Sequence, residues 1–345
     1  MYIYQTKKRM KKKILYLGNK LSKHGINKTT VETLGENLTK SGFDVVSYSS
    51  KKNSFLRILD MLFGILKHRN SDYILIDTYS TSAFWFAFFG SQLARILHIK
   101  YIPILHGGDL PNRLASNPKL CKMIFSNSFT NVSPSEYLKF HFEKFGVSNV
   151  ICIPNSINLS DYTFKERHNF TPNLLWVRAF AEIYNPKMAV DVLQLIQKKY
   201  PSATLTMVGP DKDGSLEITK NYANQLNLKV TFTGKLSKTE WTDLAKTQDI
   251  FINTTHFDNT PVSVLEAMAL GLPVVSTNVG GLPFLISHQR NGYLVNDNTT
   301  SEMVEQIENI INFPSQTIEI ISNAKSMISK MDWEVVENQW TKLLG

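Results

Sequence analysis

The segment 258–277 carries the sequence features of an anion-binding helix start. Thr260 is a favourable N-cap, and Pro261 is a favourable first helical residue. We therefore expect the backbone N–H groups of Val262 and Ser263 to have no partner within the helix. Because the helix dipole places partial positive charge at this end, an anion such as a phosphate is favoured in front of it.

Two carboxylates frame this predicted site, Asp258 just before the helix and Glu266 in its second turn. A carboxylate suits a phosphate site poorly unless a neutral, hydroxyl-rich group lies beside the phosphate. Glu266 could accept two hydrogen bonds from a ribose diol, while Asp258 and the backbone of Asn259 and Thr260 could contact a sugar ring. These residues together predict binding of a nucleotide sugar. The simpler interpretation is a capped helix whose acidic residues are solvated.

The same segment resembles the donor-binding signature of the family 4 (group 1) glycosyltransferases. The acidic residue Asp258 is followed, after seven intervening residues, by Glu266-Ala-Met-Ala. A predicted buried strand of the Gly-x-Pro-Val-Val type then starts at Gly271. The similarity continues through the pair Gly280-Gly281 and through 291–295. The sequence departs from the family pattern in having Asp258 where Glu is usual, and Asn259-Thr260 where Gly-Phe is usual.

The resemblance implies an α/β protein of the GT-B type, with two Rossmann-like doubly wound domains facing across a cleft. It also implies a reaction, the transfer of a sugar from a nucleotide-diphosphate sugar to a hydroxyl of a glycan or lipid-linked acceptor. Configuration would be retained, no metal would be needed, and no cofactor is expected beyond the nucleotide sugar as co-substrate. The donor would bind mainly to the second domain and the acceptor mainly to the first. Bacterial surface polysaccharide synthesis is the expected setting.

Two alternatives to a transferase stay open at this point. The chain could be a non-catalytic nucleotide-sugar-binding partner in a polysaccharide assembly complex, an interpretation that the departures at Asp258 and Asn259 keep open. It could also be a nucleotide-sugar epimerase, because one fold can carry several activities.

Further candidate residues follow the ends of predicted strands, where doubly wound sheets bind their ligands. Gly18 follows the first strand and would let the backbone approach a phosphate. His106 and Gly107 follow the apolar run 101–105. The resemblance places a histidine here beside the reacting sugar, so we predict a catalytic positioning role for His106 and donor contact for Gly107.

Arg178 ends the predicted strand 174–177, where a guanidinium could clamp a diphosphate and stabilise the departing charge. The family carries an arginine here and a Lys-Gly pair about a turn later, for which Lys187 is the counterpart at a longer spacing. We therefore predict Arg178 as catalytic, with His106 and Asp258, and Lys187 as donor-binding. The 211–213 Asp-Lys-Asp run follows a strand in a Gly/Pro loop, and we interpret it as a charged turn, so no metal ligands are predicted.

A chain of 345 residues suits two domains, and the alternation of strand and helix patterns predicts parallel sheets with helices on both faces. The polar segment 155–171 is the predicted hinge, so the domains are expected at 1–165 and 166–330, the resemblance adding a terminal helix, 331–345, to the first. Strands are predicted at 12–17, 44–48, 73–77, 101–105, 129–132, 150–153, 174–177, 203–208, 230–233, 250–253 and 274–276, and clear helices at 54–67, 83–90 and 187–199.

The net charge of +9 is unevenly distributed. Residues 1–170, which start with a basic run at 7–13, hold 24 Lys and Arg against 11 Asp and Glu, a net of +13. This imbalance predicts a negatively charged partner. We favour an anionic membrane surface or an acidic lipid-linked acceptor over nucleic acid, since no basic–aromatic motif is present; a basic tail that only aids solubility is the simpler alternative.

The expected location is cytoplasmic, with peripheral attachment to the inner face of the membrane as an option. The apolar run 14–18 is too short for the core of a secretory signal. The two cysteines, Cys121 and Cys152, show no metal-ligand spacing and indicate reduced thiols.

Overall fold

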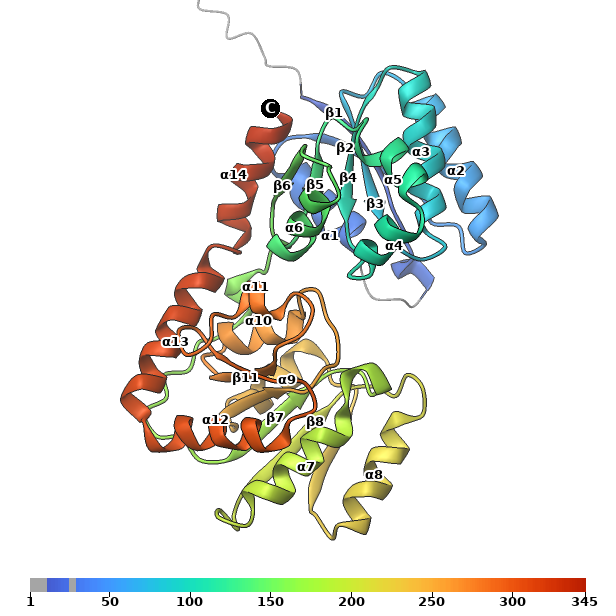
Figure 1. Cartoon of the computed structure of the whole chain (residues 1–345). Helices are drawn as coiled ribbons and strands as arrows, with labels where there is room; N and C mark the ends of the chain where they lie inside the picture. Colours follow the sequence, from blue (N-terminus) through green and yellow to red (C-terminus); the bar gives the residue numbers. More distant parts are fainter. Residues whose placement is uncertain (1–10, 25–28) are drawn as a thin grey trace, which may run out of the picture. The chain divides into compact units, whose positions relative to one another are not determined.

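The computed structural model describes residues 11–24 and 29–345 and divides the chain into two compact units (Figure 1). The first comprises Met1–Pro154 with Val336–Gly345, and the second comprises Asn155–Val335. Residues 7–10 of the predicted basic start lie outside the described residues. Within the described part of the chain, no helix combines the length and apolarity that crossing a bilayer requires.

The first unit is built on a six-stranded parallel sheet in the order β2-β1-β3-β4-β5-β6. Its apolar strands are buried on both faces, as expected when helices cover a parallel sheet. The strands are β1 (Lys13–Leu17), β2 (Asp44–Tyr48), β3 (Tyr73–Thr78), β4 (Lys100–Leu105), β5 (Asn131–Ser133) and β6 (Val150–Cys152). The helices are α1 (Thr30–Lys40), α2 (Ser54–Lys67), α3 (Phe84–Ile96), α4 (Leu110–Ser116), α5 (Pro118–Phe125), α6 (Glu136–Lys144) and most of α14 (Trp333–Leu344).

The second unit has its own six-stranded parallel sheet in the order β12-β11-β10-β7-β8-β9. When the strands are numbered within this unit, their order is 6-5-4-1-2-3, as in dinucleotide-binding Rossmann sheets. The strand order reverses between β7 and β10. The strands are β7 (Asn173–Val177), β8 (Thr204–Val208), β9 (Val230–Gly234), β10 (Ile250–Asn253), β11 (Val274–Thr277) and β12 (Tyr293–Val295). The helices are α7 (Pro186–Ile196), α8 (Ser215–Gln225), α9 (Lys238–Ala245), α10 (Val262–Ala269), α11 (Leu282–Leu285), α12 (Thr300–Asn312) and α13 (Pro314–Ser329).

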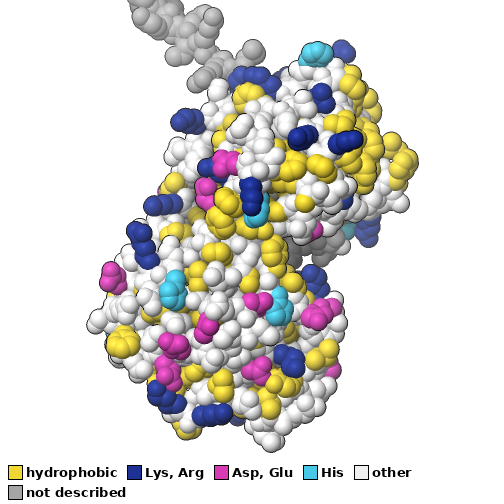
Figure 2. All heavy atoms as spheres, viewed as in Figure 1, with side chains coloured by type: hydrophobic (Ala, Val, Ile, Leu, Met, Phe, Trp, Pro, Cys, Tyr) yellow, Lys and Arg dark blue, Asp and Glu magenta, His cyan; other side chains and the backbone are white. Residues whose placement is uncertain are grey.

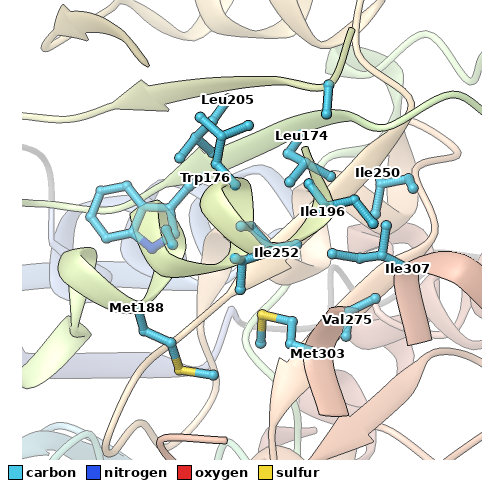
Figure 3. Close-up of a cluster of buried hydrophobic side chains, with 14 of the residues drawn as sticks. Leu174, Trp176, Met188, Ile196, Leu205, Ile250, Ile252, Val275, Met303 and Ile307 are labelled. Atoms are coloured by element: carbon cyan, nitrogen blue, oxygen red, sulfur yellow. The ribbon is translucent and has the colours of Figure 1, made fainter. Parts of the chain in front are cut away.

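The core of the second unit fixes the strand ends that carry the site. Trp176 is fully buried in the apolar cluster between the sheet, α7 and α12, together with residues such as Ile252 and Ile307 (Figure 3). Its indole Nε1–H donates to the hydroxyl of Thr254 at 3.0 Å, which links the end of β7 to the segment after β10. The predicted α/β class with two Rossmann-like domains is confirmed.

The boundary between the units differs from the predicted 165/166. Residues 155–170 belong to the second unit because they pack on it: Tyr162 and Phe170 are buried among its apolar residues, and Arg167 donates hydrogen bonds to the carbonyls of Ala245 and Leu270 at 2.9 Å. The predicted hinge appears polar because these buried residues are few and lie three to five positions apart. The predicted helix 83–90 likewise extends further, to Ile96.

Candidate active site

Arg178 and Asp258 form an ion pair beside the point where the strand order of the second sheet reverses, between β7 and β10. Arg178 directly follows β7, and Asp258 lies in the loop after β10, the neighbouring strand. The two side chains are only 15% and 16% exposed, and the Arg178 guanidinium also lies 4.0 Å from the centre of the Tyr184 ring. Two predicted catalytic residues that are 80 positions apart in the chain are therefore in direct contact.

Burial shapes the electrostatics of this pair. It raises the pKa of Asp258 above its ordinary value, while the Arg178 charge and hydrogen bonds from the N–H groups of Asn259 and Thr260 oppose that rise. The backbone of Asn259 and Thr260 was predicted to meet a sugar directly. In the structure these two N–H groups lie beside the carboxylate of Asp258, and their contact with a sugar stays a prediction.

A cavity of about 340 Å³ opens beside Arg178. Its polar lining includes Arg178, Lys235 and Ser263, and its apolar lining includes Val208 and Leu236. Lys235 was not among the predicted residues. It follows β9 and brings a second positive charge to the cavity. A site that combines two cations with an apolar wall suits a ligand with both an anionic and a planar part.

Helix α10 contributes its N-terminus to this cavity through Ser263. The helix begins one residue later than predicted: Pro261, not Thr260, is the N-cap, because Pro261 has an extended ψ of 119° and no side chain caps the helix. The hydroxyl of Ser263 is buried and has no hydrogen-bond partner among the described residues. Ser263 therefore has a hydroxyl free to bind a ligand at the positive end of the helix dipole.

Three glycines allow the main chain of this site to approach other segments closely. A Cβ on Gly209 would lie 1.7 Å from the carbonyl oxygen of Arg178. A Cβ on Gly280 would lie 2.2 Å from that of Asp258, and one on Gly281 would lie 1.9 Å from that of Asn259. The glycine pair that formed part of the family resemblance thus fixes the loop that carries Asp258.

Glu266 lies on α10, where the hydroxyl of Tyr162 donates to its carboxylate at 2.5 Å. Burial raises the pKa of Glu266, and the Tyr162 hydrogen bond and the nearby charge of Lys238 oppose the shift. The Lys238 ammonium lies 4.3 Å from the Tyr162 ring centre and is ion-paired with Asp161 at 2.8 Å. A carboxylate held in this way is positioned to exchange one of its hydrogen bonds for a ligand hydroxyl.

Lys187 does not join Arg178. It lies at the start of α7 in a different cavity of about 480 Å³, with its ammonium 4.2 Å from the Tyr222 ring centre. In the turn before it, Asn185 adopts a left-handed conformation and its side chain caps α7.

The carboxylates of the acidic run 211–213 accept hydrogen bonds from nearby backbone N–H groups. Asp211 accepts from the N–H groups of Gly214 and Leu216, and Asp213 accepts from Glu182 and Ser215. Among the residues that the structure describes, no group of three or more His, Cys, Asp or Glu is arranged to hold a metal ion.

The remaining predicted residues gather in the first unit, at the carboxyl ends of β1, β3 and β4. His106 Nε2 lies 2.8 Å from Asp77 Oδ1, which also accepts from the Tyr16 hydroxyl at 2.9 Å. Both side chains of the His106–Asp77 pair are buried. A Cβ on Gly18 would lie 2.4 Å from Asp77 Oδ2, and one on Gly107 would lie 2.8 Å from the backbone nitrogen of Ser80.

Sequence reasoning missed Lys235, Asp77 and Tyr162. Lys235 and Asp77 stand at the ends of predicted strands, so the rule that found Arg178 could have found them. Tyr162 lies in a polar segment without a pattern, and nothing in the sequence indicates that its hydroxyl reaches Glu266.

The sequence of the chain is similar to that of known glycosyltransferases. Residues 171–312 match the family model described as "Glycosyl transferases group 1". An uncharacterized glycosyltransferase from Haemophilus influenzae is 28% identical over 207 residues, which are 59% of this chain and 57% of that protein. An uncharacterized glycosyltransferase from Methanocaldococcus jannaschii is 25% identical over 326 residues, 88% of this chain and 90% of that protein.

Solved structures share the fold over almost the whole chain. A sucrose-phosphate synthase from Thermosynechococcus elongatus superposes with a TM-score of 0.78 at 16% identity, covering 96% of this chain and 98% of that one. Anabaena HepE in complex with UDP and glucose superposes with a TM-score of 0.75 at 17% identity, covering 96% and 99%. The sequence matches relate residues 171–312 to the group 1 glycosyltransferases, and the solved structures show that the chain has the two-domain GT-B fold.

Proposed function

We propose that the second unit binds a nucleotide-diphosphate sugar and that the chain transfers its sugar to a hydroxyl of a glycan or lipid-linked acceptor. The observation that carries the proposal is the cavity lined by Arg178, Lys235 and Ser263 beside the start of α10. Two cations and a helix N-terminus suit a diphosphate. The Anabaena HepE structures, which contain UDP or UDP-glucose, support a donor of this class.

The chemical step breaks the bond between the sugar's anomeric carbon and the terminal phosphate oxygen of the donor. Negative charge then develops on the diphosphate, where Arg178 and Lys235 would stabilise it. Asp258 holds the guanidinium of Arg178 in position before the donor arrives, so little reorganisation is needed. These cations supply the positive charge that the leaving group requires, which supports transfer without a metal.

Retention of configuration follows if the acceptor hydroxyl attacks from the side that the diphosphate leaves. In that case the departing phosphate oxygen accepts the hydroxyl proton, and the new bond forms to the anomeric carbon without a covalent enzyme intermediate. No protein general base is required, which agrees with a positioning role for His106, whose Nε2 is already engaged by Asp77. The ribose of the donor would bind Glu266.

We assign the acceptor to the first unit, whose polar cluster lies at the carboxyl ends of its strands. Bacterial surface polysaccharide synthesis at the inner face of the membrane would supply a lipid-linked acceptor and an anionic surface for the basic first half of the chain.

A donor hydrolysis assay tests the reaction and its stereochemistry together. UDP-glucose, GDP-mannose and ADP-glucose are incubated with the enzyme, with and without EDTA, and the released sugar is followed by proton NMR before mutarotation. The proposal predicts slow release from one donor in the presence of EDTA, with the sugar first appearing in the donor's anomeric configuration. The opposite anomer would contradict retention, and loss of release in EDTA would contradict a metal-independent reaction.

A further inference from the structure

Helix α2 exposes an apolar stripe on its outer face. The stripe starts with the neighbours Phe55 and Leu56 and continues at three- and four-residue spacing through Leu59, Phe63 and Leu66. All five side chains are 47–67% exposed. The opposite side of the helix packs into the sheet through residues such as Met61 and Ile65. A globular helix normally leaves its outer face polar, so an apolar stripe on both sides is unusual.

Helix α3 packs against α2 and continues the same surface. Phe89 lies one turn after Trp85 and Ile96 two turns after Phe89 along its outer side, and Trp85, Phe89 and Ile96 are 39%, 43% and 72% exposed. The rings of Trp85 and Phe89 stack at 5.9 Å. Figure 2 shows hydrophobic side chains gathered on the side of the first unit where Figure 1 places α2 and α3, with Lys and Arg side chains among them.

The charges that border this surface are almost all positive. The segments 51–69 and 81–100 contain seven Lys and Arg and one acidic residue, Asp60. Asp60 is partly buried and its carboxylate accepts a hydrogen bond from the hydroxyl of Ser49, so it offsets only one of the seven positive charges. The basic residues of the two segments that are exposed are Lys51, Lys52, Lys67, Arg69, Arg95 and Lys100.

We infer that the outer face of α2 and α3, defined by the eight exposed apolar residues and this basic border, docks on an anionic lipid bilayer. Aromatic and aliphatic side chains would enter the interface between headgroups and acyl chains, while the lysines and arginines contact the lipid phosphates. A second copy of the chain fits less well, since a symmetric contact would place the same basic border against itself. The inference does not depend on the proposed sugar transfer.

Vesicle co-sedimentation tests this docking directly. The full chain is mixed with vesicles of phosphatidylcholine alone or of phosphatidylcholine with phosphatidylglycerol. We expect binding to the anionic vesicles only, weakened by salt. The double variant Leu59→Gln/Phe63→Gln should bind them at least about tenfold more weakly, because two apolar anchors are lost. Lys67→Glu/Arg69→Glu should weaken binding by about fivefold or more per residue.

The matched control is Ile218→Gln/Phe313→Gln, two apolar residues of the second unit that are 59% and 55% exposed. This variant should bind like the wild type, and melting temperatures should show that all variants are folded. Equal binding of wild-type protein to both vesicle types would overturn the inference, as would unchanged binding of Leu59→Gln/Phe63→Gln. Light scattering that shows a dimer which Leu59→Gln/Phe63→Gln dissociates would assign the face to a second copy instead.

Discussion

At the scale of single residues, each half of the candidate site contains a carboxylate that contacts a basic side chain. Asp258 contacts Arg178 in the second unit, and Asp77 contacts His106 in the first. In each case a buried carboxylate fixes the orientation of the group that is expected to meet substrate. Such pre-positioned groups lose little free energy to reorganisation during a reaction.

Replacing Arg178 tests its role in stabilising the leaving group. Arg178→Gln should lower kcat by about 10²–10³, as removal of one charge-stabilising donor does in other enzymes, while KM changes less. Steady-state kinetics with the preferred donor measures both constants. Arg290→Gln, at an exposed arginine of the same unit, is the control and should behave as wild type. A change confined to KM would instead assign Arg178 to ground-state binding.

Glu266 should make stability depend on pH. Its pKa in the folded protein lies above the ordinary 4.5, so the folded state binds the proton more tightly than the unfolded state does. This contribution is fully present below pH 4.5 and is lost as the pH rises through the folded pKa. Melting temperatures should therefore fall over that window more steeply for the wild type than for Glu266→Gln. Parallel curves would show that burial does not shift the pKa of Glu266.

The exposed Glu217 provides the control for the pH experiment, since Glu217→Gln removes a carboxylate that is solvated in both states. Tyr162→Phe is a second check. Because the Tyr162 hydroxyl lowers the pKa of Glu266, its loss should raise that pKa further and widen the pH window.

Asp77 is expected to act through His106, as a positioning residue. If so, Asp77→Asn should reduce kcat in the wild type but have little further effect in a His106→Ala background. Kinetics of the two single variants and the double variant measure this coupling. Asp72→Asn, at the opposite end of the same strand, is the control. Additive effects of Asp77→Asn and His106→Ala would show that Asp77 acts independently of His106.

At the scale of helices and strands, local patterns predict much of the fold. The bounds of α2 follow from its apolar periodicity, and a capping box formed by Ser237 and Glu240 opens α9. Gly271 ends α10 with a left-handed φ of 76°, and the N–H groups of Gly271 and Leu272 return to Met268 and Ala267. Patterns fail where a short element depends on its neighbours, as with β12, whose three residues find their partner only in β11.

The glycine pair after β11 should control the loop that carries Asp258. Gly281→Ala would place a Cβ 1.9 Å from the carbonyl oxygen of Asn259, so the loop must move and donor binding should be lost. Calorimetric titration with the preferred nucleoside diphosphate measures the loss. The control, Gly214→Ala, carries the strain of a left-handed φ of 90° but meets no atom within 4 Å. It should cost about 1 kcal/mol of stability and leave binding intact. Full binding by Gly281→Ala would show that the loop position does not matter.

At the scale of the whole molecule, the alternation of strands and helices predicts two doubly wound sheets, and each sheet gathers polar residues at its carboxyl edge. The sequence indicates which strand ends carry these residues, but not which side chains meet. Lys187, predicted to bind the donor, lines a different cavity from Arg178, and Lys235, which was not predicted, lines the cavity beside Arg178. Contacts between distant segments depend on the packing of the entire sheet. The sequence likewise shows that the first half is basic but not where its positive charges gather. The contact between α2 and α3 brings the basic residues of these two segments to one surface.

The central claim is that the second unit binds a nucleoside diphosphate through its cations and α10. A thermal-shift panel tests it most directly: UDP, GDP, ADP, CMP, NAD and inorganic phosphate, each with and without EDTA, on wild type and Glu266→Ala. At about 100 times its dissociation constant a ligand adds about 2.7 kcal/mol of stability, which a melting curve detects readily. We predict that one nucleoside diphosphate stabilises the wild type in EDTA and stabilises Glu266→Ala much less. If no nucleoside diphosphate stabilises the wild type, or if phosphate alone does so equally well, the account is contradicted.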